Sequence, residues 1–506
     1  MLEFNPLMDL LLNVLRVAGL IFLVLLVFNL MIVVHEWGHF LAARWRGLKV
    51  EKFYVWFGKA IWKKKINGVE YGLGSIPMGG FVALPQMAPM DAIEGKNEEG
   101  RESLPPITPL DKIIVAFAGP LFSFLLAVFF AVVVWQVGLT EREIDTEKRI
   151  GYVAKGSPAE RDGLKVGDEI ITVDGNKVRG FRGLVESVTW YVVSSEKDVI
   201  EFKVNRPGVG EVVVPVKSEK PKQEGKTSWW TGLFTRPAFR QVGIGPVMTL
   251  KVMDFAADGA HTPAQEGGMQ KDDILRKING QPVLSTGVLS DILEENVGKP
   301  MNVEVERDGK TVPLTITTRL PDQRDKAFDI KDEAIATLGA GWDIGGSEKK
   351  RYPGPIGQLK DAGRTIYDTL RKLSPTSNSD IGASHLSGFI GIANVYYNLL
   401  QDPNGWERVL WFSVVLNVNL ALLNMLPFPV LDGGHIVMAI YEWVRRKSIN
   451  LRILEVVQTA CVILLFGFMI FISFKDTGDV IGVGRKGAEV QRVPSKFLAP
   501  EKRAAQ

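Results

Sequence analysis

Four long apolar runs dominate the pattern of hydrophobic and polar positions along this chain of 506 residues. Each run is long enough to cross a hydrocarbon core of about 30 Å as a helix. The first run is too long for a removable signal peptide, and no small-residue cleavage site follows it. The sequence therefore predicts a polytopic α-helical membrane protein with four transmembrane helices. The runs cover residues 17–34, 113–137, 409–426 and 453–474.

Shorter patterns lie between these runs. Polar and apolar residues alternate over 52–57 and 70–73, as in strands with one buried face, and Asn67-Gly68 between them is typical of a hairpin turn. The segment 79–84 begins with two glycines and is otherwise apolar, which predicts an edge strand that another backbone can approach closely. Over 355–373, apolar residues recur at helical spacing. That pattern predicts an amphipathic helix, either on the membrane surface or against another domain.

The region between the second and third apolar runs contains an internal repeat with a constant offset, since 263 − 158 = 105 residues. A period this long indicates tandem domains and not a solenoid. Each copy is followed by sequence rich in β-forming residues. The matching positions are Pro158, Ala159, Gly163, Asp168, Gly175 and Val178 in the first copy, and Pro263, Ala264, Gly268, Asp273, Gly280 and Val283 in the second.

Charge gives the orientation and excludes one class of partner. The net charge is only +3, and the basic residues gather beside the apolar runs, so no nucleic-acid surface is indicated. The positive-inside rule places the loop after the first run and the loop between the last two runs in the cytoplasm. Both termini and the segment of about 139–408 then lie outside. The single Cys461 excludes an intramolecular disulfide but does not identify the compartment.

His35-Glu36-Trp37-Gly38-His39 follows directly on the first apolar run. Two His four residues apart leave one face of a helix, and the Glu between them is placed to act as a base toward water. Chance gives such a pattern in roughly a few per thousand chains of this composition. The other interpretation, polar groups satisfied in a core, is disfavoured because ionisable groups at membrane depth are costly. The motif therefore predicts a zinc site.

A catalytic zinc takes three protein ligands and keeps a fourth position open, so His35 and His39 need one partner. Asp432 follows a Pro-x-Pro break at the same end of the third span as the HExxH motif. His435 is a rival ligand by chemistry alone, and His385 is a weaker one near the other end of that span. Taken alone, the segment is also typical of a helix-ending turn with an N-capping Asp. The HExxH motif elsewhere in the chain favours Asp432.

The repeated segments resemble bacterial PDZ domains. The first copy carries Gly-Ser-Pro-Ala at 156–159, a match over 163–171, and Asp-Gly at 174–175. The second copy resembles the pattern less, because Met-Gln-Lys-Asp at 269–272 replaces the Leu-Lys-Val-Gly stretch. PDZ domains bind an added peptide strand or a free C-terminus through backbone groups. The alternative is that both domains only block access sterically.

The whole pattern resembles the bacterial site-2 protease family, in particular its RseP-type regulators of sigma-E protease. The resemblance rests on the HExxH motif, the Asn-x-Leu-Pro-x-Pro-x-Leu-Asp-Gly-Gly run at 424–434, four spans and two PDZ domains. It implies one Zn²⁺ per chain and a membrane-associated β-loop that receives the substrate. The implied site residues are His35, His39 and Asp432 for the metal, Glu36 as the catalytic acid/base, and Asn424, Gly79, Gly80 and Phe81 for substrate binding.

The resemblance implies an intramembrane zinc metalloendopeptidase of the inner membrane, with its active site toward the cytoplasm and its PDZ domains outside. Its substrates would be single-span proteins already trimmed outside, such as an anti-sigma factor in envelope-stress signalling, and remnant signal peptides. The PDZ domains would admit only shortened substrates. The alternative is a zinc-binding membrane scaffold or transporter with PDZ recruitment modules. The presence of Glu36, and spans that show no repeated polar or inverted halves, argue against that alternative.

Two positions depart from the family pattern. Ser123 replaces Asn in the Gly-Pro-x-x-Asn-Phe element of the second span, which affects a polar substrate contact and not the metal. Phe389 replaces the Pro of a Ser-Gly-Pro element and can alter the local backbone. The expected domains are 1–138 (two transmembrane helices, HExxH and β-loop), 149–218 (first PDZ domain), 219–241 (linker), 242–319 (second PDZ domain), 350–400 (amphipathic membrane-proximal helices), 405–475 (last two transmembrane helices) and 476–506 (tail).

Overall fold

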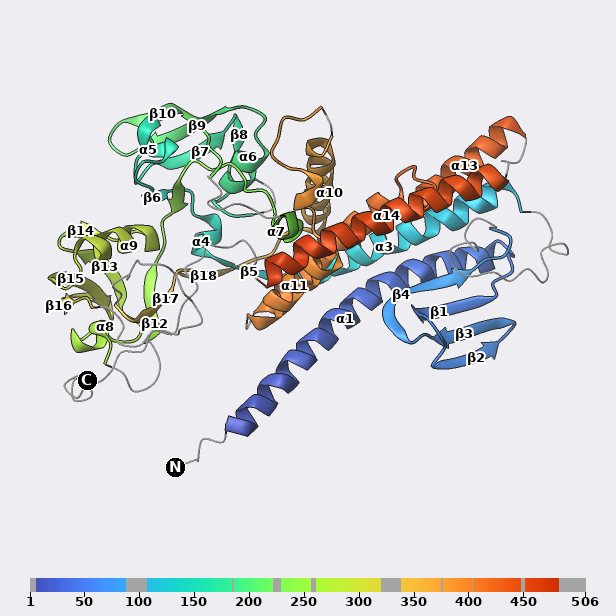
Figure 1. Ribbon diagram of the computed structural model, residues 1–506, viewed down its shortest axis with the longest axis horizontal. Coiled ribbons are helices and arrows are strands. Elements are labelled where there is room, and N and C mark those ends of the chain that lie inside the picture. The colour runs from blue at the N-terminus through green and yellow to red at the C-terminus, as the bar shows by residue number, and fades with distance from the viewer. Residues whose placement is uncertain are drawn as a thin grey trace.

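The computed structural model describes residues 6–87, 107–183, 186–221, 229–255, 261–319, 338–374, 376–402, 404–446 and 451–481. Within these residues, four helices are long and apolar enough to cross a membrane, which confirms the predicted polytopic architecture. Figure 1 shows the helices as an elongated bundle with two β-rich modules at one end and a four-stranded sheet at the other. The four helices are α1 (Pro6–Trp45), α3 (Pro109–Val137), α12 (Gly405–Asn424) and α14 (Leu451–Val480).

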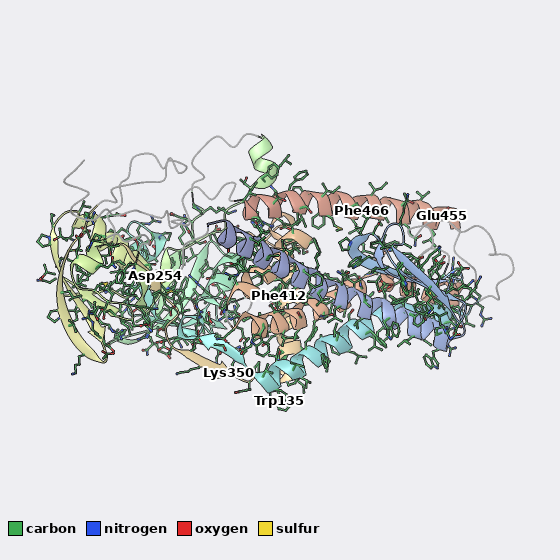
Figure 2. All side chains as sticks on the ribbon, turned by 90° about the horizontal axis from the view of Figure 1, so that it is seen from below. Trp135, Asp254, Lys350, Phe412, Glu455 and Phe466 are labelled. Atoms are coloured by element: carbon green, nitrogen blue, oxygen red, sulfur yellow. The ribbon has the colours of Figure 1, made fainter. Side chains whose placement is uncertain are left out.

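Helix α3 is the centre of the bundle, because it packs against α1, α12 and α13 (Asp432–Arg445). A reciprocal capping box between Thr108 and Asp111 fixes its first turn. Gly38 allows the close crossing of α1 over α3, since a Cβ there would lie 2.4 Å from the Ala118 carbonyl oxygen. Figure 2 shows α14, with Glu455 and Phe466, along one side of the bundle. The Phe466 side chain is 60% exposed, as expected of a surface that faces lipid.

The four-stranded sheet has the order β2-β3-β1-β4 and lies beside the C-terminal end of α1 (Figure 1). The expected turn forms at Asn67-Gly68, with φ of 49° and 83°, but it joins β2 to β3, and β1 pairs with β3 in parallel. The sequence pattern missed β2 because all its side chains are exposed, so no alternation marks it. Strand β4 is at the edge. The strands are β1 (Lys52–Phe57), β2 (Trp62–Ile66), β3 (Val69–Leu73) and β4 (Ile76–Ala83).

The two modules repeat one topology, each around its own hydrophobic core. In the first module the sheets are β10-β9-β7-β8 and β11-β6, and in the second the order is β16-β15-β13-β12-β17 with β14 on β13. The elements of the first module are β6 (Ile150–Val153), α5 (Pro158–Asp162), β7 (Glu169–Val173), β8 (Asn176–Lys177), α6 (Val188–Ser194), β9 (Val199–Arg206), β10 (Gly210–Lys217) and β11 (Ile244–Pro246). Those of the second are β12 (Leu250–Phe255), α8 (Pro263–Glu266), β13 (Ile274–Ile278), β14 (Gln281–Pro282), α9 (Thr286–Glu295), β15 (Pro300–Arg307), β16 (Lys310–Thr317) and β17 (Ala340–Asp343).

A late strand completes each module and moves the expected domain boundaries. Strand β11 pairs with β6, and β17 pairs with β12. The amides of Ala159 and Ala264 donate to the carbonyls of Val242 and Leu338, respectively, which precede these late strands. The segment from residue 242 to β11 therefore belongs to the first module and not to the second, whose sheet extends past residue 319 to β17. Both strands are short and far from their partners in sequence, so no local pattern revealed them.

Matched ion pairs explain several repeated residues of the modules. Asp168 accepts hydrogen bonds from Arg206 at 2.8 and 2.7 Å, and Asp273 accepts from Arg307 at 2.7 Å on both oxygens. Each Arg also donates to the carbonyl of the repeated glycine, Gly163 or Gly268. The two Asp residues are 0% and 1% exposed. The repeat thus preserves a buried charge together with its neutralising partner.

The segments between the modules and the bundle form a packed junction. Helix α10 (Pro355–Lys372) packs on α3 and α12 through Leu359 and Ala362, and on its other side Arg364 pairs with Glu186 of the first module. The amphipathic helix therefore packs against other parts of the protein. Strand β18 (Glu348–Arg351) pairs with β5 (Leu139–Arg142). Lys350 of β18, labelled in Figure 2, donates from its ammonium group to the buried Glu407 at 2.9 Å. Helix α4 (Glu143–Thr146) follows β5.

The region expected to be a linker contacts the last transmembrane helix. It contains α7 (Trp229–Phe234), followed by Arg236, which donates to Asp476 and Asp479 of α14 at 2.6 Å each. Asp476 also accepts the amide of Gly388, which precedes α11 (Phe389–Gln401). Phe389 is the first residue of α11, so the helix begins there without a proline. Helix α14 extends past the expected end at 475, and residues 482–506 of the predicted tail lie outside the described residues.

Candidate metal centre

Three side chains with metal-binding atoms meet where α1, α3 and α13 come together. Nε2 of His35 and Nε2 of His39 are 3.3 Å apart on one face of α1. Oδ2 of Asp432 lies 3.3 Å from Nε2 of His35, and its Oδ1 lies 3.4 Å from Nε2 of His39. The three residues are 7%, 2% and 7% exposed, respectively. Within the described residues, this is the group of His, Cys, Asp and Glu side chains arranged to hold a metal ion.

A break in the third span brings Asp432 to this position. Helix α12 ends at Asn424, and α13 begins at Asp432 after Leu431 at the N-cap position. A Cβ at Gly433 would lie 2.2 Å from the carbonyl oxygen of Met425, and one at Gly434 would lie 1.9 Å from that of Phe428. These glycines therefore let the turn fold back on the first turn of α13. Asp432 is not the N-cap, and its carboxylate faces both imidazoles.

Gly119 of α3 leaves the space that a metal needs. A Cβ there would lie 2.2 Å from Nε2 of His39 and 2.8 Å from Nε2 of His35. A tetrahedral zinc with ligands at about 2.0–2.2 Å separates its donor atoms by roughly 3.3–3.5 Å, which matches the separations observed here. Two imidazoles and a carboxylate also form a usual donor set for catalytic zinc. The residues present therefore fit zinc.

Two contacts from α3 orient the imidazoles. The Val115 carbonyl oxygen lies 2.8 Å from Nδ1 of His39, and the Ser123 hydroxyl lies 2.9 Å from Nδ1 of His35. Val115, Gly119 and Ser123 are four residues apart, so they follow one face of α3. The expectation that the Ser123 departure affects only a substrate contact is wrong, because this side chain touches a predicted ligand. The four-residue spacing of Val115, Gly119 and Ser123 in the sequence could have indicated this contact, but only if the pairing of α1 with α3 had been known.

Glu36 lies between the donor cluster and the edge strand β4. A Cβ at Gly80 would approach Cγ of Glu36 to 3.8 Å, and the amide of Val82 hydrogen-bonds to the Glu36 carboxylate. Gly79 has φ of 77°, and a Cβ there would lie 2.0 Å from the ring of Phe57. Only glycine fits that position. The carboxylate therefore stands beside the three metal-binding atoms and beside β4, which is the outermost strand of this sheet in the described part of the chain.

Of the remaining predicted residues, Asn424 lies beside the donor cluster and His385 lies elsewhere. Nδ2 of Asn424 lies 3.4 Å from Nε2 of His35, so its amide points toward the donor atoms. Phe81 packs on Tyr54 with ring centroids 5.2 Å apart. His435 is buried on α13 but does not belong to the donor cluster within the described residues. His385 bonds through Nε2 to the Pro237 carbonyl and through Nδ1 to the Gly382 amide, so both of its nitrogens are engaged elsewhere.

Comparison with known proteins agrees with this geometry. Residues 22–468 match the sequence profile described as Peptidase family M50. A Vibrio cholerae protein named "Putative zinc metalloprotease" is 26% identical over 464 residues, 88% of this chain and 96% of that protein. A Haemophilus influenzae "Regulator of sigma E protease" is 27% identical over 460 residues, 88% and 95% of the two chains.

A third relative, the Salmonella typhimurium "Regulator of sigma-E protease RseP", is 27% identical over 463 residues, 88% of this chain and 96% of that protein. The family match includes the HExxH motif, the four-stranded sheet, both modules and Asp432. It therefore covers every element that builds the donor cluster. The chain thus belongs to peptidase family M50, the site-2 proteases, and is a metalloprotease.

Proposed function

We propose that this protein is a zinc metalloendopeptidase that hydrolyses a peptide bond of a single-span substrate within the membrane. The observation that carries the proposal is the placement of the donor cluster. His35 and His39 lie on a membrane-length helix, next to Asp432 and the free edge of β4. Ionisable side chains are rare at membrane depth and mark functional sites there. A soluble substrate would not require such a placement.

His35, His39 and Asp432 would hold the zinc, and Glu36 would act as the proton carrier. Zinc in such a site supplies Lewis acidity that activates water and polarises a peptide carbonyl. Glu36 accepts the proton of the attacking water and delivers it to the leaving amine. Asn424 donates its amide N–H to the substrate carbonyl oxygen as negative charge develops on it. The contact of Glu36 with the Val82 amide keeps the carboxylate turned toward the strand edge.

The edge strand β4 would hold the substrate in an extended form. A helical segment hides its backbone in internal hydrogen bonds, so it must unwind before attack. Pairing with the free edge of β4 replaces those hydrogen bonds, and Gly79 and Gly80 let the substrate backbone come close. Residues of low helix propensity in the substrate should therefore favour cleavage.

The two modules would act as PDZ domains that filter substrates by size. The positive-inside rule puts them outside the inner membrane and the metal centre toward the cytoplasm. Two relatives are named regulators of sigma E protease, which favours an anti-sigma factor as the substrate, cut after a first protease has trimmed it outside. Remnant signal peptides are a second substrate class. Peptides or free C-termini would bind beside β11 or β17 by strand addition.

The test compares the wild type with Glu36→Gln and a matched Glu51→Gln control, each as the full chain in detergent. The substrate is a tagged single-span protein without its exterior domain, and the zinc content of every preparation is determined. We expect all three to hold about one zinc per chain, with cleavage by Glu36→Gln reduced by roughly 10²–10⁴-fold. Bound zinc without cleavage of several unrelated spans by the wild type would instead favour a membrane scaffold.

A further inference from the structure

The two zinc-site imidazoles are oriented by groups of different chemistry. His39 meets a backbone carbonyl, that of Val115, at 2.8 Å. A carbonyl oxygen only accepts, so Nδ1 of His39 carries a proton, and in the neutral imidazole Nε2 then presents its lone pair. His35 meets the hydroxyl of Ser123 at 2.9 Å. A hydroxyl both donates and accepts, so this contact permits either tautomer of His35.

We propose that Ser123 is a positioning residue for His35: in the tautomer that can bind a metal through Nε2, its hydroxyl accepts the Nδ1 proton and holds the ring with Nε2 facing Asp432. The proposal rests on the proposed zinc site and adds a residue to it. Ser123 is 0% exposed, so its hydroxyl is shielded from bulk solvent. The opposite tautomer would place a proton on Nε2, within 3.3 Å of both His39 and Asp432, and would block the metal.

The geometry of α3 supports the assignment. Val115 and Ser123 stand one helical turn before and after Gly119, whose missing side chain leaves room for the metal. His39 and His35 are also four residues apart, so the two antiparallel helices meet in register at these contacts. Partners of this kind set the orientation and basicity of a ligating imidazole, and their loss typically costs about 10–100-fold in metal affinity.

Three variants of the full chain in detergent test the proposal. Ser123→Ala deletes the hydroxyl, and Ser123→Thr keeps it. Ser413→Ala is the matched control, because Ser413 is also buried in a membrane helix but bonds to Tyr396. Zinc affinity is measured by competition with a chelator, and the visible spectrum of the cobalt-substituted protein reports the ligand geometry. We expect Ser123→Ala to lose about 10–100-fold in zinc affinity with an altered cobalt spectrum, and the other two to remain within about threefold of the wild type.

The outcomes separate this proposal from the proposed function. Wild-type zinc affinity and an unchanged cobalt spectrum in Ser123→Ala would overturn the positioning role while leaving the zinc site intact. If Ser123→Thr and Ser123→Ala lose the same zinc affinity, and thermal unfolding shows that both are folded, the effect comes from packing. That outcome would also overturn the positioning role. A wild type that binds no zinc would overturn the zinc site itself. With zinc at saturation, Ser123→Ala should recover most of its cleavage rate, whereas Glu36→Gln should not.

Discussion

The modules and the metal centre both bury carboxylates, but they neutralise them differently. In the modules, the Asp168 and Asp273 side chains are 1% and 0% exposed, and each meets an Arg at 2.7 Å. At the metal centre, the Asp432 side chain is 9% exposed and faces only two imidazoles at 3.3 and 3.4 Å. Within the described residues, no Lys or Arg pairs with Asp432.

In the modules, the buried carboxylate pairs with an Arg and stabilises the fold, whereas at the metal centre the carboxylate of Asp432 is placed to bind a ligand. A buried charge is costly unless a partner compensates it. Where the chain supplies the partner, the pair contributes to the stability of the module. At Asp432, the described neighbours are two imidazoles, which carry a positive charge only when protonated, so a bound metal ion would supply a permanent compensating charge. A substitution of a buried carboxylate in the modules should therefore lower stability and leave zinc binding unchanged. A substitution of Asp432 should abolish zinc binding and leave the stability of the metal-free protein unchanged.

The largest expected effect is that of Asp432→Asn, which removes the charge and keeps the shape. The zinc content should fall from about one per chain to near zero, and cleavage should fall to the background rate. Enzymatic rate enhancements begin near about 10⁶-fold, so the loss is limited only by detection. Without metal, this variant should melt at about the same temperature as the metal-free wild type, because in the described part of the chain the substitution breaks no pair with a Lys or Arg. Elemental analysis and thermal unfolding in detergent measure both, and a lower melting temperature would contradict the comparison.

In the second module, Asp273→Asn should lower stability and leave zinc binding unchanged. Burial opposes ionisation of Asp273, yet hydrogen bonds from Arg307 hold its pKa below the usual range. Breaking a buried pair of this kind costs about 3–5 kcal/mol. Hydrogen exchange over residues 261–319 reports the loss. The neighbouring Asp272 is exposed and pairs with Lys251, so Asp272→Asn is a matched control with little expected effect.

A third substitution changes the metal centre without changing a charge. Gly119→Ala places a methyl group 2.2 Å from Nε2 of His39, so the imidazoles must shift. Overpacking typically costs about 1–3 kcal/mol, and if this cost falls on the metal-bound form, zinc affinity should fall by roughly 5- to 150-fold. Gly363→Ala in α10 is the control, because a Cβ there meets no atom within 4 Å. Equal zinc affinity in Gly119→Ala and Gly363→Ala would show that the missing side chain of Gly119 is not what leaves room for the metal.

The smallest effect is a pH dependence at the junction between the first module and the bundle. Burial disfavours the ionised Asp380, but hydrogen bonds from Arg240 and Lys220 lower its pKa to about 2. Because this pKa lies below the unfolded value of about 3.9, the stability from Asp380 is complete above about pH 5 and is lost as the pH falls toward about 2. Between pH 7 and pH 3 the loss is about 1 kcal/mol. Because other carboxylates also titrate over this range, the stability loss between pH 7 and pH 3, measured by thermal unfolding, should be larger by about 1 kcal/mol in the wild type than in Asp380→Asn.

The parts predicted correctly from the sequence have signals that are local in the chain. Apolar runs mark the membrane helices, and they need no knowledge of their neighbours. The structure brings together His35 and His39, four apart on one helix, with Asp432, whose Pro-x-Pro-x-Leu-Asp-Gly-Gly context is equally local. The metal-binding roles of these residues stay predictions.

The missed parts depend on tertiary contacts. Strand β2 has no buried face, so its sequence shows no alternation. Helix α13 has 14 residues and follows a proline-rich turn, so it is too short to be recognised as a span. The late strands β11 and β17 pair with distant segments. The contact of Ser123 with His35 appears only when α1 and α3 are brought into register.

The break between α12 and α13 determines what a cleaved product can do next. Helix α13 has 14 residues, so it is about 21 Å long at 1.5 Å per residue. If the proposed cleavage takes place beside Asp432 and the product leaves past α13, the product would retain an apolar stub of about 14 residues if helical, or about six if extended. Such a stub is too short to cross a bilayer but apolar enough to adhere to its surface. Under the proposed function, proteolysis here would convert an integral protein into a peripheral one, and full release into solution would require a soluble factor that covers or degrades the stub.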